Sequence, residues 1–127
     1  MTPESYRVLV TGSRTWRDRA AIVDALDELH AEYGALIVVH GGAVGADRMA
    51  GQWVQGMRHA HVLSVTAEPH AADWRQHGKQ AGFIRNAEMV ALGADVCLAF
   101  IRENSPGASH CAALAGKAGI PVRRFTS

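Results

Sequence analysis

The sequence predicts an α/β fold, in which a mostly parallel sheet of about five strands lies between two layers of helices as a three-layer α/β/α sandwich. Short apolar runs rich in β-branched residues alternate along the chain with longer segments whose apolar residues recur at helical spacing. Strands that are separated by helices pair in parallel through right-handed crossovers. Glycines stand at many of the boundaries between these segments, as is typical where a chain changes direction.

The predicted strands are short and are bounded by glycine, proline or polar residues. The first ends at Gly12, and its nearly continuous apolar residues are typical of a strand that is buried on both faces. The fourth is the most hydrophobic and is expected near the centre of the sheet, whereas Pro121 and the charges that follow it place the fifth at an edge. The predicted strands are 7–11, 36–39, 61–66, 94–101 and 121–125.

Helices are predicted between these strands. Asp18 is a suitable N-cap for the first helix, and Gly34, Gly93 and Gly119 are suitable stops for the first, third and fourth. Segment 67–82 is polar, contains a proline and lacks a clear period, so it is expected to be a loop with at most a single helical turn. The predicted helices are 18–33, 46–57, 83–92 and 109–118.

The composition predicts one globular domain over residues 1–127. Hydrophobic residues make up 48% of the chain and charged residues 20%, which is globular rather than disordered composition. The chain has 13 Lys and Arg against 12 Asp and Glu. This balance makes nucleic acid an unfavoured partner, because a surface that coats nucleic acid is strongly cationic, but a local basic pocket is compatible with it.

The expected location is the cytoplasm. Cys97 and Cys111 lie in apolar runs without the spacing of a disulfide framework or a zinc site, which favours reduced, buried thiols. Residues 1–5 lack the basic and apolar regions of a secretory signal. No apolar run approaches the length of a membrane span, so no membrane partner is expected.

The stretch from His40 to Asp47 follows the second predicted strand and carries paired glycines that lead into a helix. Backbone N–H groups at such a turn, with the positive end of a helix dipole behind them, form an anion site. Glycine suits this role because a phosphate can approach its backbone closely. The spacing matches neither G-x-G-x-x-G nor the P-loop, and a tight turn without a ligand is an equally simple interpretation.

Two other glycine-containing loops are expected at the same edge of the sheet. In open parallel sheets, ligands bind at the carboxyl ends of the strands. The loops 12–16, 41–47 and 103–109 all follow strands and all lead into helices. Together they predict a site for a phosphate-bearing ligand.

Four motifs in order along the chain resemble those of a known family. They are Val10-Thr11-Gly12-Ser13-Arg14, then Gly41-Gly42-Ala43-x-Gly45-Ala46-Asp47, then Gly78-Lys79-x-Ala81-Gly82-x-x-Arg85-Asn86-x-x-Met89, and finally Ala99-Phe100 with a glycine turn and Ala118-Gly119-Ile120-Pro121-Val122. The pattern resembles the SLOG superfamily of Rossmann-like nucleotide-binding proteins, above all its small YspA type, which is related to YpsA. The resemblance covers nearly the whole chain.

This resemblance implies a nucleotide or nucleotide-sugar pocket at the same edge, and a homodimer. The superfamily also includes lonely-guy phosphoribohydrolases, DNA-processing protein A and predicted sensors of ADP-ribose-like signals. The phosphoribohydrolases carry P-G-G-x-G-T and then a catalytic glutamate on the next helix. Residues 105–113 correspond to that stretch, but no carboxylate follows on this helix, although Arg85 matches the family's helix arginine. The departure weakens the expectation of hydrolysis, because an oxocarbenium-like state needs a nearby carboxylate.

The candidate ligand residues have both functional and structural interpretations. Ser13 and Arg14 are expected to hold phosphate oxygens, with turn capping and a solvent-facing side chain as the alternatives. Asp47 either braces the glycine loop or bonds a ribose hydroxyl, and Trp16 either stacks on a base or packs against the first helix. The candidates are Gly12, Ser13, Arg14, Trp16, Gly41, Gly42, Ala43, Gly45, Asp47, Lys79, Arg85, Asn86, Gly107 and Ser109.

Arg85 and Asn86 lie in an otherwise apolar segment, where a charge needs a partner. That partner is either the ligand or a salt bridge to Glu88 or Asp95, and ligand contact is favoured because Trp74 and Lys79 precede the segment in a loop that can cover the site.

For catalysis the candidates are Arg85, Asp47 and His110. No group of histidines, cysteines or acids has metal-ligand spacing, so no metal and no cofactor are expected. Neither Ser13 nor Ser109 has an evident partner for nucleophilic catalysis.

Three functions follow, in order of preference. The first is a sensor or binding module for an AMP- or ADP-ribose-like nucleotide. The second is a nucleotide N-glycosidase that uses Arg85 with Asp47, Glu88 or His110 in place of the absent glutamate. The third is single-stranded nucleic-acid binding, which the near-neutral charge disfavours.

Overall fold

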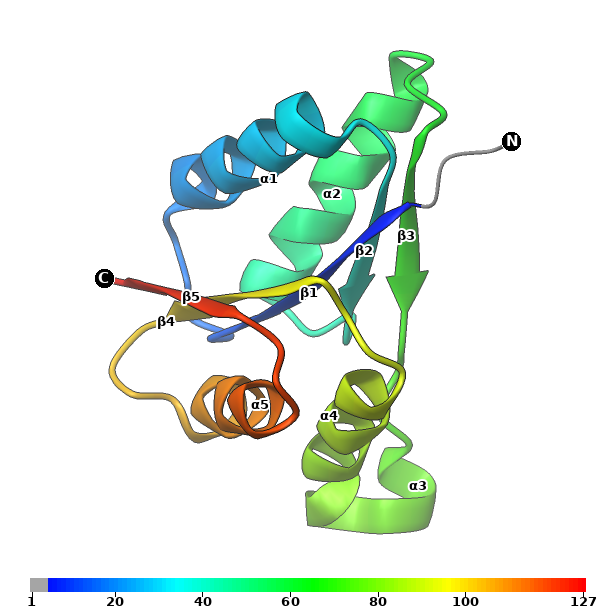
Figure 1. Cartoon of the computed structure of the whole chain (residues 1–127). Coiled ribbons are helices and arrows are strands. Elements are labelled where there is room, and N and C mark those ends of the chain that lie inside the picture. The colour runs from blue at the N-terminus through cyan, green and yellow to red at the C-terminus, as the bar shows by residue number, and fades with distance from the viewer. Residues whose placement is uncertain (1–4) are drawn as a thin grey trace.

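The computed structural model describes residues 5–127 and contains one parallel five-stranded sheet in the order β3-β2-β1-β4-β5. Figure 1 shows the sheet with helices on both faces, which confirms the predicted Rossmann-like three-layer architecture. The strands are β1 (Tyr6–Gly12), β2 (Leu36–His40), β3 (Val65–Pro69), β4 (Val96–Ile101) and β5 (Val122–Thr126).

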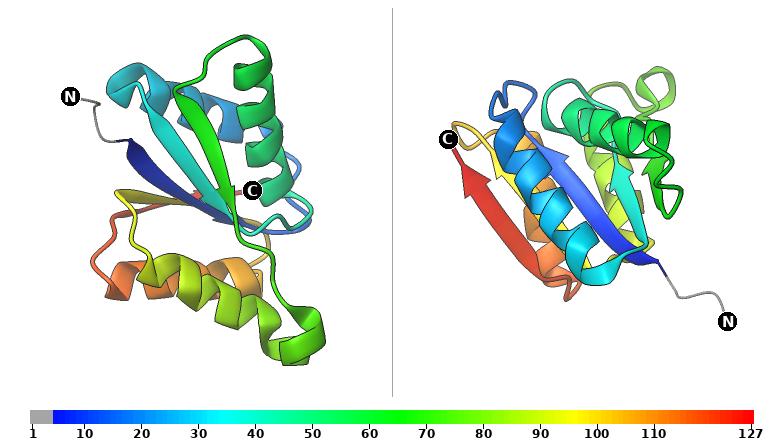
Figure 2. Two further views of the ribbon diagram at one scale, coloured as in Figure 1. Left: turned by 90° about the vertical axis from the view of Figure 1, so that its right-hand side faces the viewer. Right: turned by 90° about the horizontal axis from the view of Figure 1, so that it is seen from above.

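Two helices cover one face of the sheet and the remaining helices cover the other, as the views in Figures 1 and 2 show. α1 and α2 lie together on the first face, and α3, α4 and α5 lie on the second. The helices are α1 (Arg19–Tyr33), α2 (Ala46–His59), α3 (Trp74–His77), a 3₁₀ turn η1 (Gly78–Gln80), α4 (Ala81–Ala91) and α5 (Pro106–Lys117).

The alternation of side chains along β1 and β4 divides the core into two layers. Val8, Val10 and Phe100 pack toward α1 and α2, whereas Leu9 and Cys97 pack toward α4 and α5. All five side chains are fully buried. Each face of the sheet therefore has its own apolar layer. The loops that lead to the helices of both layers meet at the ends of the strands.

Both cysteines are free and buried, as the sequence predicted. Burial raises the pKa of the Cys97 thiol to about 12 and that of the Cys111 thiol to about 11. Each thiol therefore stays protonated within the α4 and α5 layer, where it packs as an apolar side chain. Within residues 5–127, no helix is both long and apolar enough to cross a membrane.

Local signals placed several element ends correctly. Asp18 caps α1 by accepting a hydrogen bond from the Ala21 N–H at 3.1 Å, and Gly34 ends the helix with a φ of 77°. β5 lies at the edge of the sheet, as its proline and charges predicted. β4 is buried along its whole length and pairs on both sides, while β1 is the middle strand.

The third strand was predicted four residues too early. Its expected start at His61 lies instead in the turn after α2, where His61 has a φ of 66° and Leu63 is 64% exposed. The strand begins at Val65, which pairs with Leu36. The apolar pair before Val65 resembled a strand because the sequence does not show which apolar residues reach the core.

Two helix assignments also needed correction. The segment predicted as a loop contains β3 to Pro69, then α3 and η1 before α4 begins. α5 starts at Pro106 rather than at Ser109, because proline suits the first turn of a helix, where its missing N–H is not needed. The earlier start brings the N-terminus of α5 to the carboxyl ends of β1 and β4.

Candidate functional site

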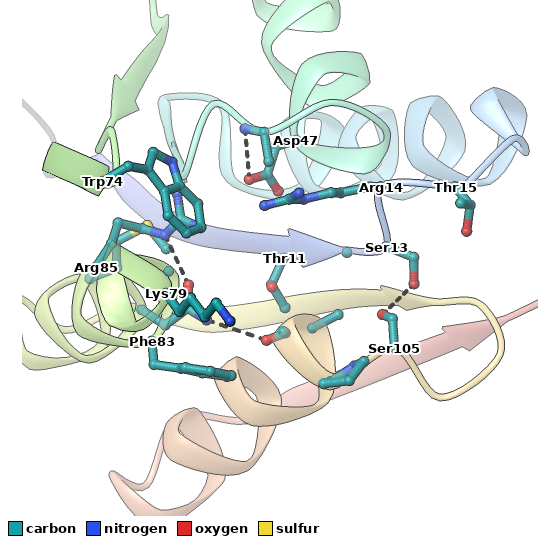
Figure 3. A pocket seen from close by; sticks show the side chains of 18 residues that line it. Thr11, Ser13, Arg14, Thr15, Asp47, Trp74, Lys79, Phe83, Arg85 and Ser105 are labelled. Atoms are coloured by element: carbon teal, nitrogen blue, oxygen red, sulfur yellow. Dashed lines mark hydrogen bonds between the residues drawn. The ribbon is translucent and has the colours of Figure 1, made fainter. Parts of the chain in front are cut away.

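A cavity of about 350 Å³ lies at the carboxyl ends of β1 and β4, in the size range of small-molecule sites. Its walls come from the end of β1 and the loop after it (11–15), from the N-cap and first residues of α5 (105–108), and from residues of α3, η1 and α4 between positions 74 and 89. The loop after β2 contributes Ala43, and the first turn of α2 contributes Asp47. Figure 3 shows these segments converging on one space. They meet at the carboxyl ends of the strands, where the sequence analysis expected the glycine-containing loops to lie.

The Gly41–Asp47 loop is held closed on itself. One carboxylate oxygen of Asp47, Oδ2, accepts hydrogen bonds from the N–H groups of Gly41 at 3.1 Å and Ala43 at 3.3 Å. Nδ1 of His40 accepts from the N–H of Gly42 at 3.0 Å. Three of the amides that were expected to face a phosphate are therefore already bonded within the loop, and the loop's role as an amide cradle needs correction.

The other oxygen of Asp47, Oδ1, is buried and has no hydrogen-bond partner among the described residues. The carboxyl lines the cavity, and its residue is only 6% exposed. Burial raises its pKa to about 6, against the opposing influence of the Ala43 amide and of the Arg85 charge. A buried acceptor without a partner, on a residue that lines a cavity, is suited to a donor group on a ligand.

Arg85 and its neighbour Asn86 connect the Gly41–Asp47 loop, the β3–α3 loop and the first turn of α5. Nη1 of Arg85 donates to the carbonyl of Gly41 at 2.7 Å and to that of His70 at 3.3 Å. Its Nε donates to Oδ1 of Asn86 at 3.0 Å, and Nδ2 of Asn86 donates to the carbonyl of Gly107 at 3.3 Å. Neither of the expected acidic partners of Arg85 is used, because backbone carbonyls take their place.

Three loop glycines are fixed by packing. A Cβ on Gly12 would overlap the Cβ of Ala46 at the start of α2, and a Cβ on Gly41 would overlap the Arg85 guanidinium. Gly45 has a φ of 84°, and a Cβ there would overlap the backbone of Ser13. These glycines are thus needed for the close approach of protein segments, whether or not a phosphate is present.

Ser13 fastens the first loop to the loop before α5. Its hydroxyl lies 2.6 Å from that of Ser105 and accepts a hydrogen bond from the N–H of Arg102 at 2.8 Å. Ser13 is only 2% exposed, although it lies in the cavity wall. Its hydroxyl therefore holds two loops together, which is close to the turn-capping alternative.

Trp16 does not reach the cavity. It is 2% exposed, donates from Nε1 to the carbonyl of Asp18 at 2.8 Å, and packs edge-on against Phe100 at 5.5 Å between ring centres. The indole lies in the layer beneath α1 and α2, so its packing role replaces the predicted stacking on a base.

The aromatic groups at the cavity are Trp74 and Phe83, which are 50% and 38% exposed. Neither was among the predicted ligand residues, although Trp74 was expected in a loop that can cover the site. Trp74 occupied a segment that was expected to be a loop, and Phe83 had the spacing of a core residue. Their exposure depends on how α3 and α4 lie against the loop after β1, which no local pattern reveals.

Positive charge is concentrated at the mouth of the cavity. The guanidinium of Arg14 lies 5.8 Å from the centre of the Trp74 ring, and Lys79 also lines the wall. Figure 3 shows both cations pointing into the space that Trp74 and Phe83 face. In residues 5–127, neither Arg14 nor Lys79 forms an ion pair. The first turn of α5, at Gly107 and Ala108, adds the positive end of a helix.

The cavity walls bring together most of the predicted ligand residues. Gly41 and Gly42 line a second, adjacent cavity instead. Trp16, Gly45 and Ser109 line neither cavity. The predicted residues that line the main cavity are Gly12, Ser13, Arg14, Ala43, Asp47, Lys79, Arg85, Asn86 and Gly107.

Two of the residues considered for catalysis lie outside the cavity wall. His110 packs edge-on against Phe83, with 4.6 Å between ring centres, and its Nδ1 is buried without a partner among the described residues. Glu88 is exposed on α4. Asp47 is thus the one carboxylate in the described wall. In residues 5–127, no group of three or more His, Cys, Asp or Glu side chains forms a metal site.

A charged network behind the cavity was not predicted. Arg7 donates to both carboxylate oxygens of Glu68, at 3.1 and 2.9 Å, and Nε2 of His70 lies 2.8 Å from Glu68 Oε2. These hydrogen bonds, from Arg7 above all, lower the pKa of Glu68 to about 2. Since the His70 carbonyl accepts from Arg85, the network connects the far end of β1 to the cavity wall.

Comparison with known proteins agrees with this architecture. The chain is 58% identical over 120 residues to the Gene 61 protein of Mycobacterium phage D29, which covers 94% of this chain and 95% of the relative. Among solved structures it is similar to DNA processing protein A from Helicobacter pylori, with a TM-score of 0.62 and 19% identity. That match covers 94% of this chain but only 64% of the other, so the chain spans less than two thirds of it, and the likeness shows the fold alone.

The family-level match covers the first three strands and both helices between them, which include two of the three loops at the cavity. The model of the YspA, cpYpsA-related SLOG family matches residues 6–77. With more than half of the chain matched, and with the phage relative alongside, the chain belongs to the YspA, cpYpsA-related SLOG family.

Proposed function

We propose that the protein is a binding module for a nucleotide or nucleotide-derived ligand of the AMP or ADP-ribose type. Membership of the SLOG family indicates a module that binds nucleotides or nucleic acid. The observation that carries the proposal is a single cavity with exposed aromatic faces, unpaired cations and a buried acceptor without a partner. These groups match the base, the phosphate and the ribose of a nucleotide.

The base is assigned to the aromatic side of the cavity. Trp74 and Phe83 present apolar ring faces to the same space, and stacking on such faces contributes about 1–3 kcal/mol for each base. Stacking requires no particular pattern of hydrogen bonds on the base. This side of the cavity therefore supports binding of a base without specifying which base is preferred.

The phosphate is assigned to the cationic mouth. Arg14 comes from the loop after β1 and Lys79 from η1, and within residues 5–127 no carboxylate forms an ion pair with either. The N-terminus of α5, with its proline and glycine, lies beside them. Charge-assisted hydrogen bonds from such groups are stronger than neutral ones, so they supply most of the affinity for an anionic ligand.

The ribose is assigned to Asp47. Its Oδ1 is buried at the cavity wall and lacks a donor, and a ribose hydroxyl supplies one. The sequence offered two roles for Asp47, bracing the glycine loop and bonding a ribose hydroxyl, and we assign one role to each carboxylate oxygen. Oδ2 holds the loop amides, and Oδ1 is left for the ligand.

A second candidate function is nucleotide N-glycosidase, and one observation favours it. Asp47 has a pKa of about 6, so near neutral pH a fraction of its side chains retain a proton that could be given to a leaving base. Against this, Arg85 already donates to backbone carbonyls. Incubation with nucleoside monophosphates, followed by chromatography for free base, decides between binding and turnover.

Fluorescence titration with AMP tests the binding proposal. Trp16 and Trp53 are buried whereas Trp74 is exposed, so a nucleotide that stacks on Trp74 quenches mainly the Trp74 emission. We expect a Kd on the order of micromolar for AMP. W74A and W74F lack the Trp74 emission, so their affinities are measured by calorimetric titration. We expect at least about tenfold weaker AMP binding in W74A and near-normal binding in W74F, which keeps a ring face. No saturable quenching by AMP, ADP or ADP-ribose would refute the proposal.

A matched pair of lysine variants tests the phosphate assignment. K79Q removes a cation at the cavity mouth, and K117Q removes one from the last turn of α5, away from the cavity. K79Q is expected to weaken AMP binding by about fivefold to tenfold, and K117Q to leave it unchanged. Equal affinities in both variants would exclude the assignment of the phosphate to Lys79.

Nucleic acid is tested in the same titration. The structure of the Helicobacter pylori protein concerns single-stranded DNA binding, and a DNA strand contains the same base and phosphate groups. The near-neutral net charge of +1 disfavours a long strand, which needs many cationic contacts. An oligonucleotide that bound more tightly than AMP and lost its affinity steeply with salt would favour nucleic acid instead.

A further inference from the structure

We propose that residues 73–80, which contain α3 and η1, form a lid over the main cavity, and that the contact between Arg14 and Trp74 is its latch. The latch occupies the two groups that the proposed function assigns to the base and the phosphate. An anion that binds Arg14 releases the latch, so the site accepts a base more readily once a phosphate is present. The inference rests on the nucleotide function proposed above and adds how access to that site is controlled.

The lid lies on the surface of the molecule. Neither α3 nor η1 has a buried residue, and both pack against α4. Their hydrogen bonds are local: Oδ1 of Asp73 accepts from the Gln76 N–H at 3.1 Å, and the Asp73 carbonyl accepts from the His77 N–H at 3.0 Å. Within residues 5–127, no hydrogen bond or ion pair joins the lid to the loop after β1 or to α5. Movement of the lid therefore leaves the hydrogen bonds of those segments intact.

The backbone on either side of α3 provides places at which the lid can turn. Before the lid, the His70 N–H donates to the carbonyl of His40 at 2.8 Å, which fixes the chain up to that residue, and the short link Ala71–Ala72 follows. Between α3 and η1, Gly78 has a φ of 56° and a ψ of −133°, which glycine adopts more readily than any other residue. A Cβ at Gly78 would meet no atom within 4 Å, so packing does not require a glycine there. Hinges of moving lids are short backbone segments of this kind.

The latch closes the mouth of the cavity. Trp74 borders α4, since a Cβ on Gly82 would lie 3.6 Å from its ring. From the loop after β1, the Arg14 guanidinium reaches toward the same ring and lies 5.8 Å from its centre (Figure 3). Arg14 is exposed, Trp74 is 50% exposed, and Arg14 forms no ion pair within residues 5–127. An exposed cation–π contact shifts an equilibrium by about twofold to fivefold, so the latch is weak enough for a ligand to open.

The latch couples the binding of a phosphate to the binding of a base. A guanidinium interacts more strongly with a phosphate than with an uncharged ring, because the ionic contact adds charge-assisted hydrogen bonds. A phosphate beside Lys79 and the first turn of α5 therefore draws Arg14 away from Trp74 and frees the ring. An uncharged nucleoside has to separate Arg14 from Trp74 without this compensation. Because binding free energies are linked reciprocally, phosphate and nucleoside each raise the affinity for the other.

The variant R14Q tests the latch because it is expected to have opposite effects on two ligands. It removes both the contact with Trp74 and a phosphate contact. In calorimetric titrations, R14Q is expected to bind adenosine about twofold to fivefold more tightly than the unmodified chain, and AMP at least about fivefold more weakly. The control variant is R17Q, which removes the same charge from an exposed position in the same loop that lines neither cavity. R17Q is expected to bind both ligands as the unmodified chain does.

Inorganic phosphate tests the coupling in the unmodified chain. Phosphate is expected to raise the adenosine affinity by about twofold to fivefold, whereas sodium chloride at the same ionic strength leaves it unchanged. In R14Q, phosphate is expected to have no effect on adenosine binding. An adenosine affinity that R14Q leaves unchanged or lowers would overturn the latch.

Movement of the lid is measured without a nucleotide. Trp16 and Trp53 are buried, so acrylamide quenches mainly the Trp74 emission. This quenching, and hydrogen exchange in residues 73–80, are expected to increase in R14Q and to stay unchanged in R17Q. Unchanged quenching and exchange in R14Q would overturn the lid, and the nucleotide function would stand if AMP still bound. Failure of both AMP and adenosine to bind would overturn the nucleotide function, and increased quenching in R14Q would then still support the lid.

Discussion

Replacing Asp47 by asparagine is expected to stabilise the fold while it weakens ligand binding. The carboxyl is 6% exposed, and burial raises its pKa from 3.8 to about 6. A carboxyl whose pKa is higher in the folded state than in the unfolded chain makes the fold less stable once it ionises. In D47N the amide oxygen can accept the Gly41 and Ala43 N–H groups without ever carrying a charge.

The size of the effect follows from the pKa. Below pH 3.8 the carboxyl is protonated in both states, so the native protein has its full stability with respect to this group. As the pH rises to about 6, the unfolded chain loses the proton first, and the free energy of unfolding falls. At about 1.4 kcal/mol for each tenfold change in the ionisation constant, the total loss is about 3 kcal/mol.

Denaturation in urea between pH 4 and pH 8 measures this difference. D47N is expected to gain about 2.5 kcal/mol relative to the unmodified chain as the pH rises from 4 to 8, because part of the total loss has already occurred at pH 4, and most of the gain is complete by pH 7. D24N removes the same charge from an exposed position on α1 and provides the baseline. If the stability difference between D47N and the unmodified chain does not change with pH, the buried-carboxylate reasoning is wrong.

The same variant tests the role of Oδ1 in binding. In asparagine, the position of the unpartnered oxygen would be taken by an amide NH₂, a donor where the proposed ribose hydroxyl needs an acceptor. AMP affinity is therefore expected to fall by about tenfold although the fold gains stability. A gain in both quantities would show that Asp47 is only a loop brace.

Other predictions follow from packing and ionisation. G12A is expected to lose about 1–3 kcal/mol of unfolding free energy because its Cβ would overlap that of Ala46, and the double variant G12A/A46G should recover part of the loss. E68Q should lose about 1 kcal/mol of unfolding free energy at pH 7, a small value because the Glu68 carboxylate is 35% exposed and partly screened by solvent. Hydrogen bonds from Arg7 lower the pKa of Glu68 from 4.5 to about 2, so this stabilisation is present above pH 4.5 and is lost as the pH falls to about 2. Both cysteines should react with a thiol reagent at pH 8 only after unfolding, because burial raises the pKa of each thiol. Rapid reaction in the native state would contradict the observed burial.

The sheet could be predicted because its signals are local. The hydrophobic pattern that separates a strand from a helix extends over only a few residues, and caps such as Asp18 and Gly34 bond to backbone groups nearby in the sequence. The error at the third strand has the opposite origin. Leu63 looks like a strand residue, but it is exposed because the ladder with β2 begins at Val65. Pairing between strands decides that boundary, and pairing partners are distant in the sequence.

The site was predictable in position and only partly in detail. The carboxyl ends of β1 and β4 follow from the order of elements, and so does the convergence of their loops. The sequence placed Trp74 in a loop that can cover the site, but it did not show that the Trp74 ring lines the cavity while the Trp16 ring is buried in the core. The Trp16 ring packs against Phe100, whereas the Trp74 ring is half exposed, and this difference depends on tertiary packing.

The Gly41–Asp47 loop shows why a glycine motif alone does not establish that the backbone amides of the loop bind a phosphate. The side chain of Asp47 takes two of those amides, His40 takes a third, and Arg85, 44 residues further along the chain, binds the Gly41 carbonyl. A loop held in this way is rigid before any ligand arrives, so it presents the remaining oxygen of Asp47 at a fixed place in the cavity wall. Preorganisation lowers the entropy that binding must overcome. The glycine motif of this loop therefore reflects how the cavity wall is held in shape, and the ligand contacts that we propose come chiefly from residues outside this loop, Arg14 and Trp74.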